Sequence, residues 1–378
     1  MKILFLDQTG KLGGAELSLI DVVQAFHKSS SVILFQDGPF RSRLEDLGIS
    51  VEVFKSSGLG SRKESGLLAG LRSIIAAFPL IKHVAVTAKD YDYIYANTQR
   101  AFVIGALASC LSGRPLVYHL RDILSRQHFS KLNLYVISIL ARRVAKVVIT
   151  NSKATQQSFL DLGGQPEKVH VVYNGFDPNI YRSDSDQRDH LRTHLSVSDK
   201  FVIGHFSRLS PWKGQHILLQ ALQKCPDSAV VLFVGDALFG EDDYVQELHQ
   251  QVETLGLSDR VHFLGFRSDI PELMNACDVI AHTSTAPEAF GRVIVEGMLC
   301  GIPVIASADG GAAELVQSGK TGWSIEPGNV EVLAAALVEC MENSDLRDSI
   351  VSNAKSYALD NFQVDRLQRE IPELLMRL

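Results

Sequence analysis

Two glutamates, Glu288 and Glu296, lie eight residues apart in the segment TAPEAFGRVIVEGMLCGIPVIAS, residues 285–307. A Phe-Gly pair stands between them. The glycine allows the chain to turn tightly and begin a helix, whose first backbone N–H groups then point at an anion. Eight residues at helical rise span roughly 12 Å. Because a carboxylate accepts two hydrogen bonds from a diol, this spacing suits a ligand with a hydroxyl-rich group at each end and a diphosphate in the middle.

Two cations stand in the segment SRLSPWKG, where Arg208 and Lys213 lie between an apolar run and a helix-like stretch. Arginine offers a bidentate fork, lysine a point charge and the helix its free N–H groups, which together make an anion site. The alternative is a solvated loop with two ordinary surface charges. In the same way, Glu296 can be a charge on a helix face and Glu288 an acid that the helix dipole stabilises.

The first half of the chain carries a glycine pair and a histidine at two strand ends. Gly13 and Gly14, in GKLGGAE, predict a tight loop that lets the backbone approach a ligand, and Glu16 follows at the start of a helix. His119 ends the strand-like run PLVYH, and we expect it at the rim of a ligand cleft. A simple strand-to-helix turn and a structural histidine are the alternatives.

Strand-like runs alternate with longer amphipathic stretches, the pattern of parallel sheets covered on both faces. A loop rich in turn formers, 174–189, divides the series. We predict an α/β protein with two Rossmann-like parallel-sheet domains, 1–173 and 174–361, facing a central cleft at the carboxyl ends of their strands. A terminal helix, about 362–378, packs back on the first domain. The expected strands are 2–6, 32–36, 51–54, 93–96, 116–119, 146–150, 169–172, 201–206, 229–234, 261–264, 278–282 and 303–306.

The composition excludes several classes of function. A net charge of −6 gives no broad basic footprint, so nucleic acid is not an expected partner. The five cysteines are widely spaced without a CxxC pair, which argues for reduced thiols in a cytoplasmic protein and against a zinc site. No apolar run reaches 18 residues. Segment 129–148 has an apolar body with basic residues; it predicts either contact with the inner face of a membrane or a core helix with a basic end.

Two further patterns are rejected. Asp90 and Asp92 have the DxD spacing of a metal-binding motif, but they lie at the entrance to the strand of YDYIYAN, in an architecture other than the one that uses this motif. An NAD-binding loop is also not supported, because Gly10, Gly13 and Gly14 do not form G-x-G-x-x-G. We therefore predict neither a metal site nor a resident cofactor.

The pattern Glu288-x-Phe-Gly-x4-Glu296, with Arg208 and Lys213-Gly214 upstream, closely resembles the retaining glycosyltransferases of the GT-B fold, family 4. The resemblance covers nearly the whole chain, including GGAE (13–16), NGFD (174–177), GIPVIAS and GKTGWSIEPGN. It implies a hexosyltransferase that moves a sugar from a nucleoside diphosphate-sugar, with UDP-hexose favoured, to a saccharide or lipid-linked saccharide acceptor in bacterial polysaccharide or glycan biosynthesis. The UDP-sugar is then a co-substrate and no cofactor is expected.

The resemblance also implies residue roles. Arg208 and Lys213 hold the diphosphate, Glu288 and the Phe-Gly backbone face the donor sugar, Glu296 binds the ribose, and the loop 265–269 meets the base. The implied catalytic residues are Glu288, His119, Arg208 and Lys213. The implied donor-binding residues are Gly13, Gly14, Arg208, Lys213, Arg267, Glu288, Ala289, Phe290, Gly291, Arg292, Val293 and Glu296.

The chain departs from the family at two positions, where His119-Leu-Arg-Asp122 replaces the common His-Asp and Ser207 replaces a glycine. The fixed cations make a divalent ion unnecessary, so we expect metal independence. No carboxylate is placed as a nucleophile, and front-face attack is the mechanism that the resemblance implies. The alternatives are a GT-B nucleotide-sugar epimerase, a phosphorylase, for which a pyridoxal-binding lysine context is missing, and a non-catalytic nucleotide-sugar-binding protein.

Overall fold

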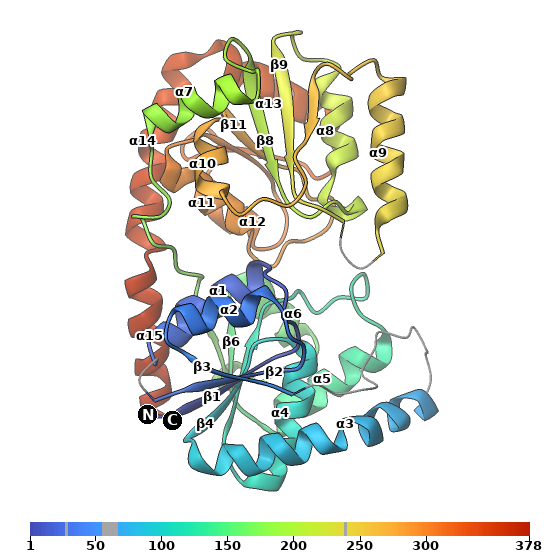
Figure 1. Cartoon of the computed structure of the whole chain (residues 1–378), viewed down its shortest axis with the longest axis vertical. Coiled ribbons are helices and arrows are strands. Elements are labelled where there is room, and N and C mark those ends of the chain that lie inside the picture. Colours follow the sequence, from blue (N-terminus) through green and yellow to red (C-terminus); the bar gives the residue numbers. More distant parts are fainter. Residues whose placement is uncertain (27–28, 55–66, 238–239) are drawn as a thin grey trace. The chain divides into compact units, whose positions relative to one another are not determined.

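The computed structural model describes residues 1–26, 29–54, 67–237 and 240–378. They form two compact units (Figure 1). Unit 1 contains residues 1–175 and 364–378, and unit 2 contains residues 176–363. Each unit is a parallel β-sheet covered by helices on both faces. The predicted class, α/β with two Rossmann-like domains, is confirmed.

Unit 1 is built on a seven-stranded parallel sheet. Its strands are β1 (Ile3–Asp7), β2 (Ser31–Leu34), β3 (Ser50–Val53), β4 (Tyr93–Ala96), β5 (Leu116–Leu120), β6 (Ala145–Thr150) and β7 (Val169–Val171). Their order in the sheet is β3-β2-β1-β4-β5-β6-β7. The chain reverses its direction of winding between β1 and β4, so the loops after these two strands diverge at the carboxyl edge, where such sheets bind ligands.

The helices of unit 1 form two layers. They are α1 (Gly14–Gln24), α2 (Pro39–Asp46), α3 (Leu67–Thr87), η1 (Ala88–Asp90), α4 (Gln99–Ser112), α5 (Lys131–Arg143), α6 (Lys153–Asp161), η2 (Pro166–Lys168) and α15 (Val364–Met376), where η denotes a 3₁₀ helix. Alternate strand residues point to opposite faces. Leu4 and Leu6 pack on the face of α3 to α6, while Ile3 and Phe5 pack on the face of α1, α2 and α15. Burial on both faces explains the continuous apolar runs of these strands.

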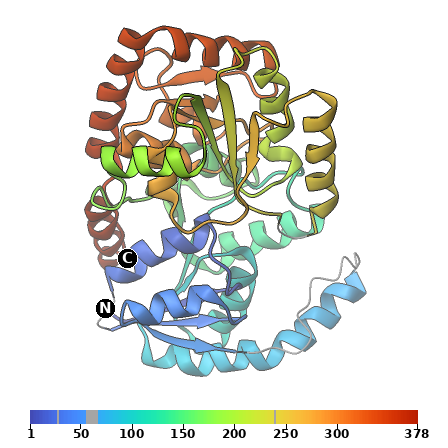
Figure 2. The same ribbon diagram turned by 45° about the horizontal axis from the view of Figure 1, so that its top comes forward.

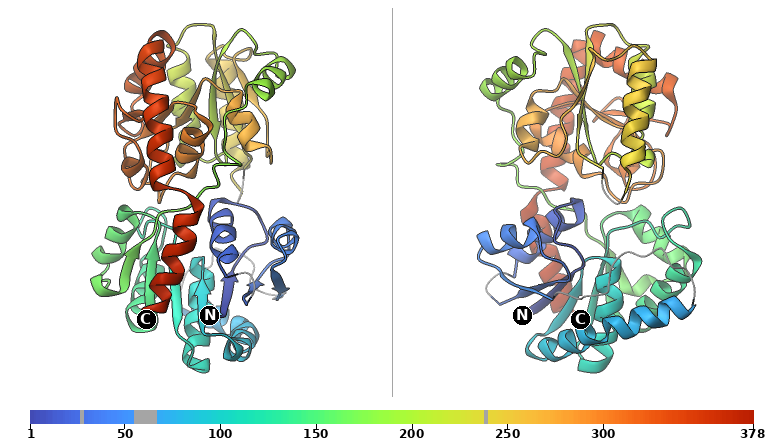
Figure 3. Two further views of the ribbon diagram at one scale, coloured as in Figure 1. Left: turned by 90° about the vertical axis from the view of Figure 1, so that its left-hand side faces the viewer. Right: turned by 45° about the vertical axis from the view of Figure 1, so that its right-hand side comes forward.

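Helix α15 brings the end of the chain back onto unit 1, where it lies beside α1 (Figure 3). Leu367, Ile371 and Leu375 recur at helical spacing and are fully buried in the core around β1. Tyr93 Oη donates a hydrogen bond to the carbonyl of Leu375 at 3.1 Å, and Gln368 Nε2 donates one to the carbonyl of Asp21 at 3.1 Å. The last residues of the chain therefore complete the core that the first residues begin.

Unit 2 is built on a six-stranded parallel sheet. Its strands are β8 (Phe201–Phe206), β9 (Ala229–Val234), β10 (Val261–Phe263), β11 (Val279–His282), β12 (Val304–Ser307) and β13 (Trp323–Ile325). Their order in the sheet is β10-β9-β8-β11-β12-β13. Each predicted strand is found within two residues of its expected ends, but β13 was not predicted. This edge strand is as short as β7 and β10, but Glu326 follows it, whereas Val172 and Leu264 extend the apolar runs of those two strands.

The helices of unit 2 cover both faces of its sheet (Figures 1 and 2). They are α7 (Ser185–His194), η3 (Pro211–Lys213), α8 (Gln215–Leu222), α9 (Asp242–Thr254), α10 (Ile270–Asn275), α11 (Arg292–Cys300), α12 (Ala312–Leu315), α13 (Val330–Glu342) and α14 (Ser344–Asn361). Helices α8, α9 and α13 pack on one face. Across the described parts of both units, none of the helices combines the length and the apolar character that crossing a bilayer requires.

Strands β8 and β11 are neighbours at the centre of this sheet, although β9 and β10 come between them along the chain. Since β8 and β11 run in the same direction, the loops that follow them leave from the same edge. One loop carries Arg208 and Lys213, and the other carries Glu288. The topology therefore brings the two motifs of the sequence to one place.

Candidate functional site

The loop after β8 is fixed to the loop after β11 through Gly214. This residue adopts φ +73°, and a Cβ atom on it would lie 2.0 Å from the carbonyl oxygen of Thr283. Thr283 Oγ1 contacts the carbonyl oxygens of Lys213 at 2.9 Å and Gly214 at 3.0 Å. His205, near the end of β8, contacts the same hydroxyl at 3.0 Å. Only glycine accommodates both the backbone angle and the close approach.

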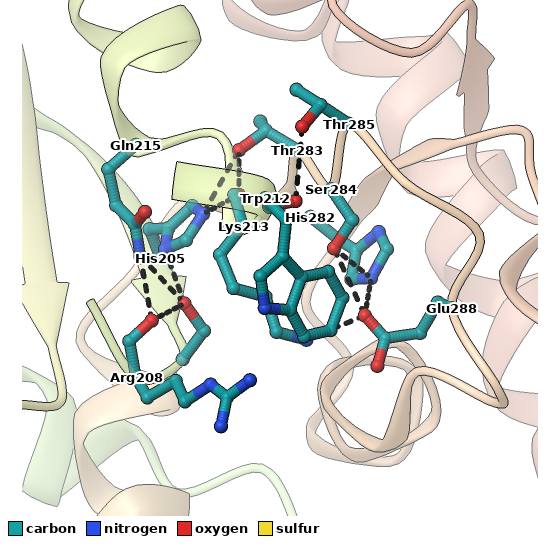
Figure 4. Close-up of polar contacts among 11 residues, drawn as sticks. His205, Arg208, Trp212, Lys213, Gln215, His282, Thr283, Ser284, Thr285 and Glu288 are labelled. Atoms are coloured by element: carbon teal, nitrogen blue, oxygen red, sulfur yellow. Dashed lines mark hydrogen bonds and ion pairs between the residues drawn. The ribbon is translucent and has the colours of Figure 1, made fainter. Parts of the chain in front are cut away.

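Lys213 and Glu288 form a largely buried ion pair at the centre of the site (Figure 4). Lys213 Nζ lies 2.6 Å from Glu288 Oε2, and each side chain is 15% exposed. Ser284 Oγ donates to the same oxygen at 3.0 Å, and His282 Nε2 lies 3.3 Å from it. In the described part of the chain no donor contacts Glu288 Oε1. The three contacts therefore fix one carboxylate oxygen and leave the other available.

The surroundings of Glu288 favour its ionised form. Burial disfavours the charge, but the Lys213 ammonium and the hydrogen bond from His282 hold the pKa of the Glu288 carboxyl well below its usual range. His205 differs, because burial and the nearby His282 lower the pKa of its imidazole to about 3. At neutral pH the site thus holds a carboxylate and an ammonium beside a neutral His205.

Arg208 and Lys213 both lie close to the Trp212 indole (Figure 4). The Arg208 guanidinium carbon is 5.5 Å from the ring centroid and Lys213 Nζ is 4.0 Å from it. Gln215, in the first turn of α8, donates from Nε2 to the carbonyl of Arg208 at 2.9 Å and to Ser207 Oγ at 3.0 Å. Ser207, which stands where the family usually has glycine, thus helps to anchor the loop.

The second motif begins a helix, as predicted. Gly291 has φ +95° and precedes α11, whose first residue is Arg292. The preceding backbone is held by a glycine pair after β12: the N–H of Gly311 donates to the carbonyl of Glu288 at 2.6 Å. Phe290 is buried, 6.2 Å from Phe176 between ring centroids. The phenyl ring of Phe290 is therefore part of the core and is not available to a ligand.

Glu296 occupies a separate polar cluster on α11. Its carboxylate is buried, and Oε1 accepts from Tyr181 Oη at 3.2 Å and from Arg292 Nε at 3.2 Å. Burial raises the pKa of the Glu296 carboxyl, while Arg292 and Tyr181 oppose the shift. Glu296 is therefore not a solvated charge on a helix face. The predicted separation of roughly 12 Å between Glu288 and Glu296 assumed helical rise over all eight residues. Helix α11 begins only at Arg292, so helical geometry does not support that value.

The glycine loop of unit 1 serves a buried carboxyl. Gly13 is the N-cap of α1, and a Cβ atom on it would lie 2.7 Å from Glu16 Oε2. The Glu16 carboxyl accepts from the backbone N–H of Gly13, as the acid of a capping box does. Burial and the nearby Asp7 raise the pKa of the Glu16 carboxyl to about 8. The absence of a side chain at Gly13 is thus needed by Glu16 itself, whether or not a ligand approaches.

His119 does not have the predicted position. Strand β5 continues to Leu120, so His119 does not end the strand, and its side chain is 0% exposed instead of lying at a rim. Nδ1 is 2.5 Å from Tyr95 Oη and 3.2 Å from Arg121 Nη2. Burial and the Arg121 charge hold the pKa of the imidazole well below its usual range. The ring is therefore neutral and enclosed in the described conformation.

The remaining predicted residues lie at three places in the chain. Gly14 opens α1 in unit 1. Arg267, in the loop after β10, pairs with Asp269 at 2.8 Å through Nε. Ala289 and Val293 flank the turn at Gly291. Among the described residues no group of three or more possible metal ligands is found, and Asp92 accepts from the N–H of Lys2 at 2.8 Å.

Sequence reasoning missed His282, Ser284, Gln215 and Tyr181. The first two form part of a polar run, HTS, at the end of the apolar strand β11, and polar residues at a strand end were a usable signal. Gln215 directly follows the recognised Lys213-Gly214 motif, and this position was also a usable signal. Tyr181 offered no signal, because its contact with Glu296 spans 115 residues of sequence.

The site combines a cationic loop, a helix N-terminus and an oriented carboxylate at the carboxyl edge of a parallel sheet. Preorganised positive charge of this kind stabilises an anionic leaving group without reorganisation at the moment of reaction. The carboxylate oxygen that remains available accepts hydrogen bonds from hydroxyl groups. The arrangement suits a ligand that is anionic at one end and rich in hydroxyls at the other.

Comparisons with known proteins cover both units. Residues 186–357 match the family described as glycosyl transferases group 1, and residues 12–180 match the family described as glycosyltransferase family 4. The crystal structure of Anabaena Alr3699/HepE in complex with UDP and glucose is 52% identical in sequence, with 100% of both chains covered and a TM-score of 0.94. Another structure of that protein contains UDP-glucose. WaaG, a glycosyltransferase involved in lipopolysaccharide biosynthesis, is 18% identical with a TM-score of 0.74, a likeness of fold alone.

Curated relatives match more distantly. Spore coat protein SA of Bacillus subtilis (strain 168) is 30% identical over 245 residues, 60% of this chain and 64% of that protein. The UDP-Gal:alpha-D-GlcNAc-diphosphoundecaprenol alpha-1,3-galactosyltransferase of Escherichia coli is 22% identical over 351 residues, 91% of this chain and 88% of that protein. The chain thus spans less than two thirds of the length of the first of these relatives.

The raised pKa of Glu16 predicts a pH-dependent stability. As pH rises from the reference value of 4.5 to about 8, the unfolded chain loses this proton first, so stability falls across that window. Glu16→Gln keeps an acceptor for Gly13 but carries no such proton. The melting temperature of the variant minus that of the parent should therefore be higher at pH 8.5 than at pH 5. We expect this difference to increase by roughly 2–4 °C, the shift that about 1 kcal/mol produces in a domain of this size.

Thermal melting of both proteins at the two pH values measures this gain. Asp7, whose carboxyl pKa burial raises to about 6, acts in the same direction and interacts with Glu16, so the gain of the variant reports the Glu16 proton together with its interaction with Asp7. Parallel loss of stability in parent and variant would show that Glu16 is not the group that titrates.

Proposed function

The chain belongs to the group 1 glycosyltransferases, and from that premise we propose that it transfers a hexose from a UDP-sugar, with retention at the anomeric carbon, to a saccharide or lipid-linked saccharide acceptor in bacterial glycan biosynthesis. The observation that carries the proposal is the Lys213–Glu288 pair beside Arg208. It is supported by 52% identity, over the whole chain, to a protein crystallised with UDP-glucose. UDP-glucose is therefore the first donor to test.

Lys213 and Arg208 are proposed to hold the diphosphate. An ammonium has three N–H donors, and Lys213 gives one of them to Glu288 Oε2. The others and the guanidinium fork of Arg208 are suited to phosphate oxygens. These fixed charges would stabilise the departing diphosphate without a divalent ion, so we propose that the reaction is metal-independent.

Glu288 and Glu296 are proposed to bind opposite ends of the donor. Oε1 of Glu288 faces the sugar hydroxyls, and the backbone at 289–293 lies beside the phosphate and sugar. Glu296, whose Oε1 is already held by Tyr181 and Arg292, offers Oε2 to the ribose. The loop 265–269, where Arg267 pairs with Asp269, meets the base.

The proposed reaction breaks the bond between the anomeric carbon and the diphosphate oxygen. The acceptor hydroxyl oxygen forms the new bond on the same face of the sugar, and its proton passes to the departing phosphate. In unit 1, the backbone of Gly13 and Gly14 is proposed to contribute to donor binding. His119, enclosed beneath Tyr95 and Arg121, supports this region from the interior instead of contacting the sugar.

Release of UDP from UDP-glucose tests the proposed activity and its metal independence. We expect turnover that EDTA does not reduce and that Lys213→Met lowers by roughly 10²–10³-fold, as loss of a preorganised charge does. Lys224→Met is the matched control, because Lys224 is an exposed lysine that pairs with Glu331. Abolition of turnover by EDTA would exclude metal independence. Turnover of UDP-glucose to a second nucleotide sugar with no acceptor would indicate an epimerase, and binding without UDP release a non-catalytic protein.

The two glutamates should respond differently to removal of their charge. Glu296→Gln should weaken UDP and UDP-glucose binding alike, by about 1.5–3 kcal/mol, because both ligands contain the ribose. Glu288→Gln should leave UDP affinity no weaker, since it frees Lys213, and should lower turnover because only the sugar contacts Glu288. Calorimetric titration of both variants with both ligands measures these losses. Equal losses for all four combinations would contradict the assignment.

The outer face of α5 is proposed to contact an anionic membrane. Leu132 and Tyr135 are 41% and 64% exposed on adjacent turns, and residues 123–160 contain no Asp or Glu. The segment carries the cations Arg126, Lys131, Arg142, Arg143, Lys146 and Lys153. The whole chain has a net charge of −6, but the charged side chains of this segment are all positive. Positive charges together with exposed apolar side chains suit contact with an acidic lipid surface, where a lipid-linked acceptor would be located.

Cosedimentation with vesicles tests this surface. We expect binding to vesicles that contain phosphatidylglycerol, little binding to phosphatidylcholine alone, and about a tenfold loss or more when Lys131→Glu and Arg143→Glu are combined, since each basic residue contributes about 1 kcal/mol. Tyr135→Ser should also weaken binding. Phe78→Ser, on α3, removes an aromatic side chain that is 57% exposed and serves as the control. Equal binding to both kinds of vesicle, or an equal loss for Phe78→Ser, would contradict the proposal.

A further inference from the structure

His282 is a buried histidine whose two ring nitrogens have unequal surroundings. It ends strand β11 and is 5% exposed. Nε2 lies 3.3 Å from Glu288 Oε2 and 3.3 Å from Ser284 Oγ. Nδ1 is buried and has no hydrogen-bond partner in the described part of the chain. A neutral imidazole carries one proton, and the only acceptor that either nitrogen meets among the described residues is at Nε2.

We propose that His282 is a positioning residue for the reaction: its Nε2–H, together with Ser284, holds Oε2 of Glu288 and thereby directs Oε1 toward the donor sugar. The inference rests on the proposed function of Glu288. His282 itself does not touch substrate in this assignment. It acts through the orientation of the carboxylate, in the way that an outer hydrogen-bond partner fixes a ligating side chain.

The need for such a residue follows from the double demand on Lys213. An ammonium is a point charge with rotating donors and sets no preferred plane for a carboxylate. When the same ammonium binds a diphosphate, its attraction is shared between the phosphate and Glu288. The hydrogen bonds from Ser284, at 3.0 Å, and from His282 do not depend on the phosphate. They maintain the orientation of Glu288 while the charge of Lys213 is engaged.

Charged and titratable groups surround His282. Lys213 contacts the same Glu288 oxygen, Oε2, and His205 faces the same region from β8. The proton on Nε2 is the one directed at Glu288 Oε2. A general acid or base would have to exchange this proton with a substrate. Nδ1 is enclosed and Nε2 is directed at Glu288, so the ring is placed to orient and not to transfer protons.

Two substitutions at this position separate donation of a hydrogen bond from shape. His282→Phe keeps a planar ring without a donor, and His282→Gln restores an N–H near the position of Nε2. We expect His282→Phe to lower kcat with UDP-glucose by roughly 10- to 100-fold, the range for a lost hydrogen bond to a charged group. The Kd for UDP should stay within about twofold, because UDP lacks the hexose that Glu288 is proposed to contact. His282→Gln should recover at least half of the loss on a logarithmic scale.

Thermal melting of both variants establishes that they are folded, and ¹⁵N NMR of the imidazole provides a readout that needs no turnover. The parent should show a protonated Nε2 and an unprotonated Nδ1, with an Nε2 signal that shifts in Glu288→Gln. The inference is overturned if His282→Phe has the same kcat as the parent, or if folded His282→Gln recovers none of the lost kcat. It is also overturned if His282→Phe loses UDP affinity as strongly as it loses kcat, or if the parent carries the proton on Nδ1. If the parent releases no UDP while the NMR signature is present, the proposed function fails and the assigned contact between His282 and Glu288 stands.

Discussion

The ion pair between Lys213 and Glu288 is the interaction on which the site depends. Removing two charges from water costs several kcal/mol per ion, and the attraction between them offsets this only with good geometry and further hydrogen bonds. Here the geometry is a 2.6 Å contact, and Ser284 adds a hydrogen bond to the same oxygen. The two loops must approach closely for the pair to form, which explains Gly214 against the carbonyl of Thr283. The loop that carries Lys213 and the segment that carries Glu288 are thus held together in one site.

The fold could be predicted from the sequence because its parallel strands are buried on both faces and read as continuous apolar runs. The exception shows the limit of the method. Strand β13 is as short as the edge strands β7 and β10, but Glu326 ends its apolar run, whereas Val172 and Leu264 extend the runs of those strands far enough to be recognised. The helix start at Gly291 was also predictable. Glycine is the residue that most readily adopts a positive φ, and Gly291 has φ +95° where the chain turns into α11.

The site was only partly predictable. Residue types identified Lys213, Glu288 and Glu296, since charged groups at the ends of apolar runs have few structural reasons to be there. Their partners are set by tertiary contacts. Tyr181 meets Glu296 across 115 residues, and no local pattern indicates this. His119 was misplaced because its strand continues for one more residue, which puts the ring in the interior beside Tyr95.

A crystal structure of this protein with intact UDP-glucose tests the central claim most directly. The account predicts that Lys213 Nζ contacts a phosphate oxygen, that Glu288 Oε1 accepts from a sugar hydroxyl, and that Oε2 remains in contact with Ser284 and His282. A complex in which the sugar lies away from Glu288, or in which Oε2 has left Ser284 to meet the sugar, would contradict it.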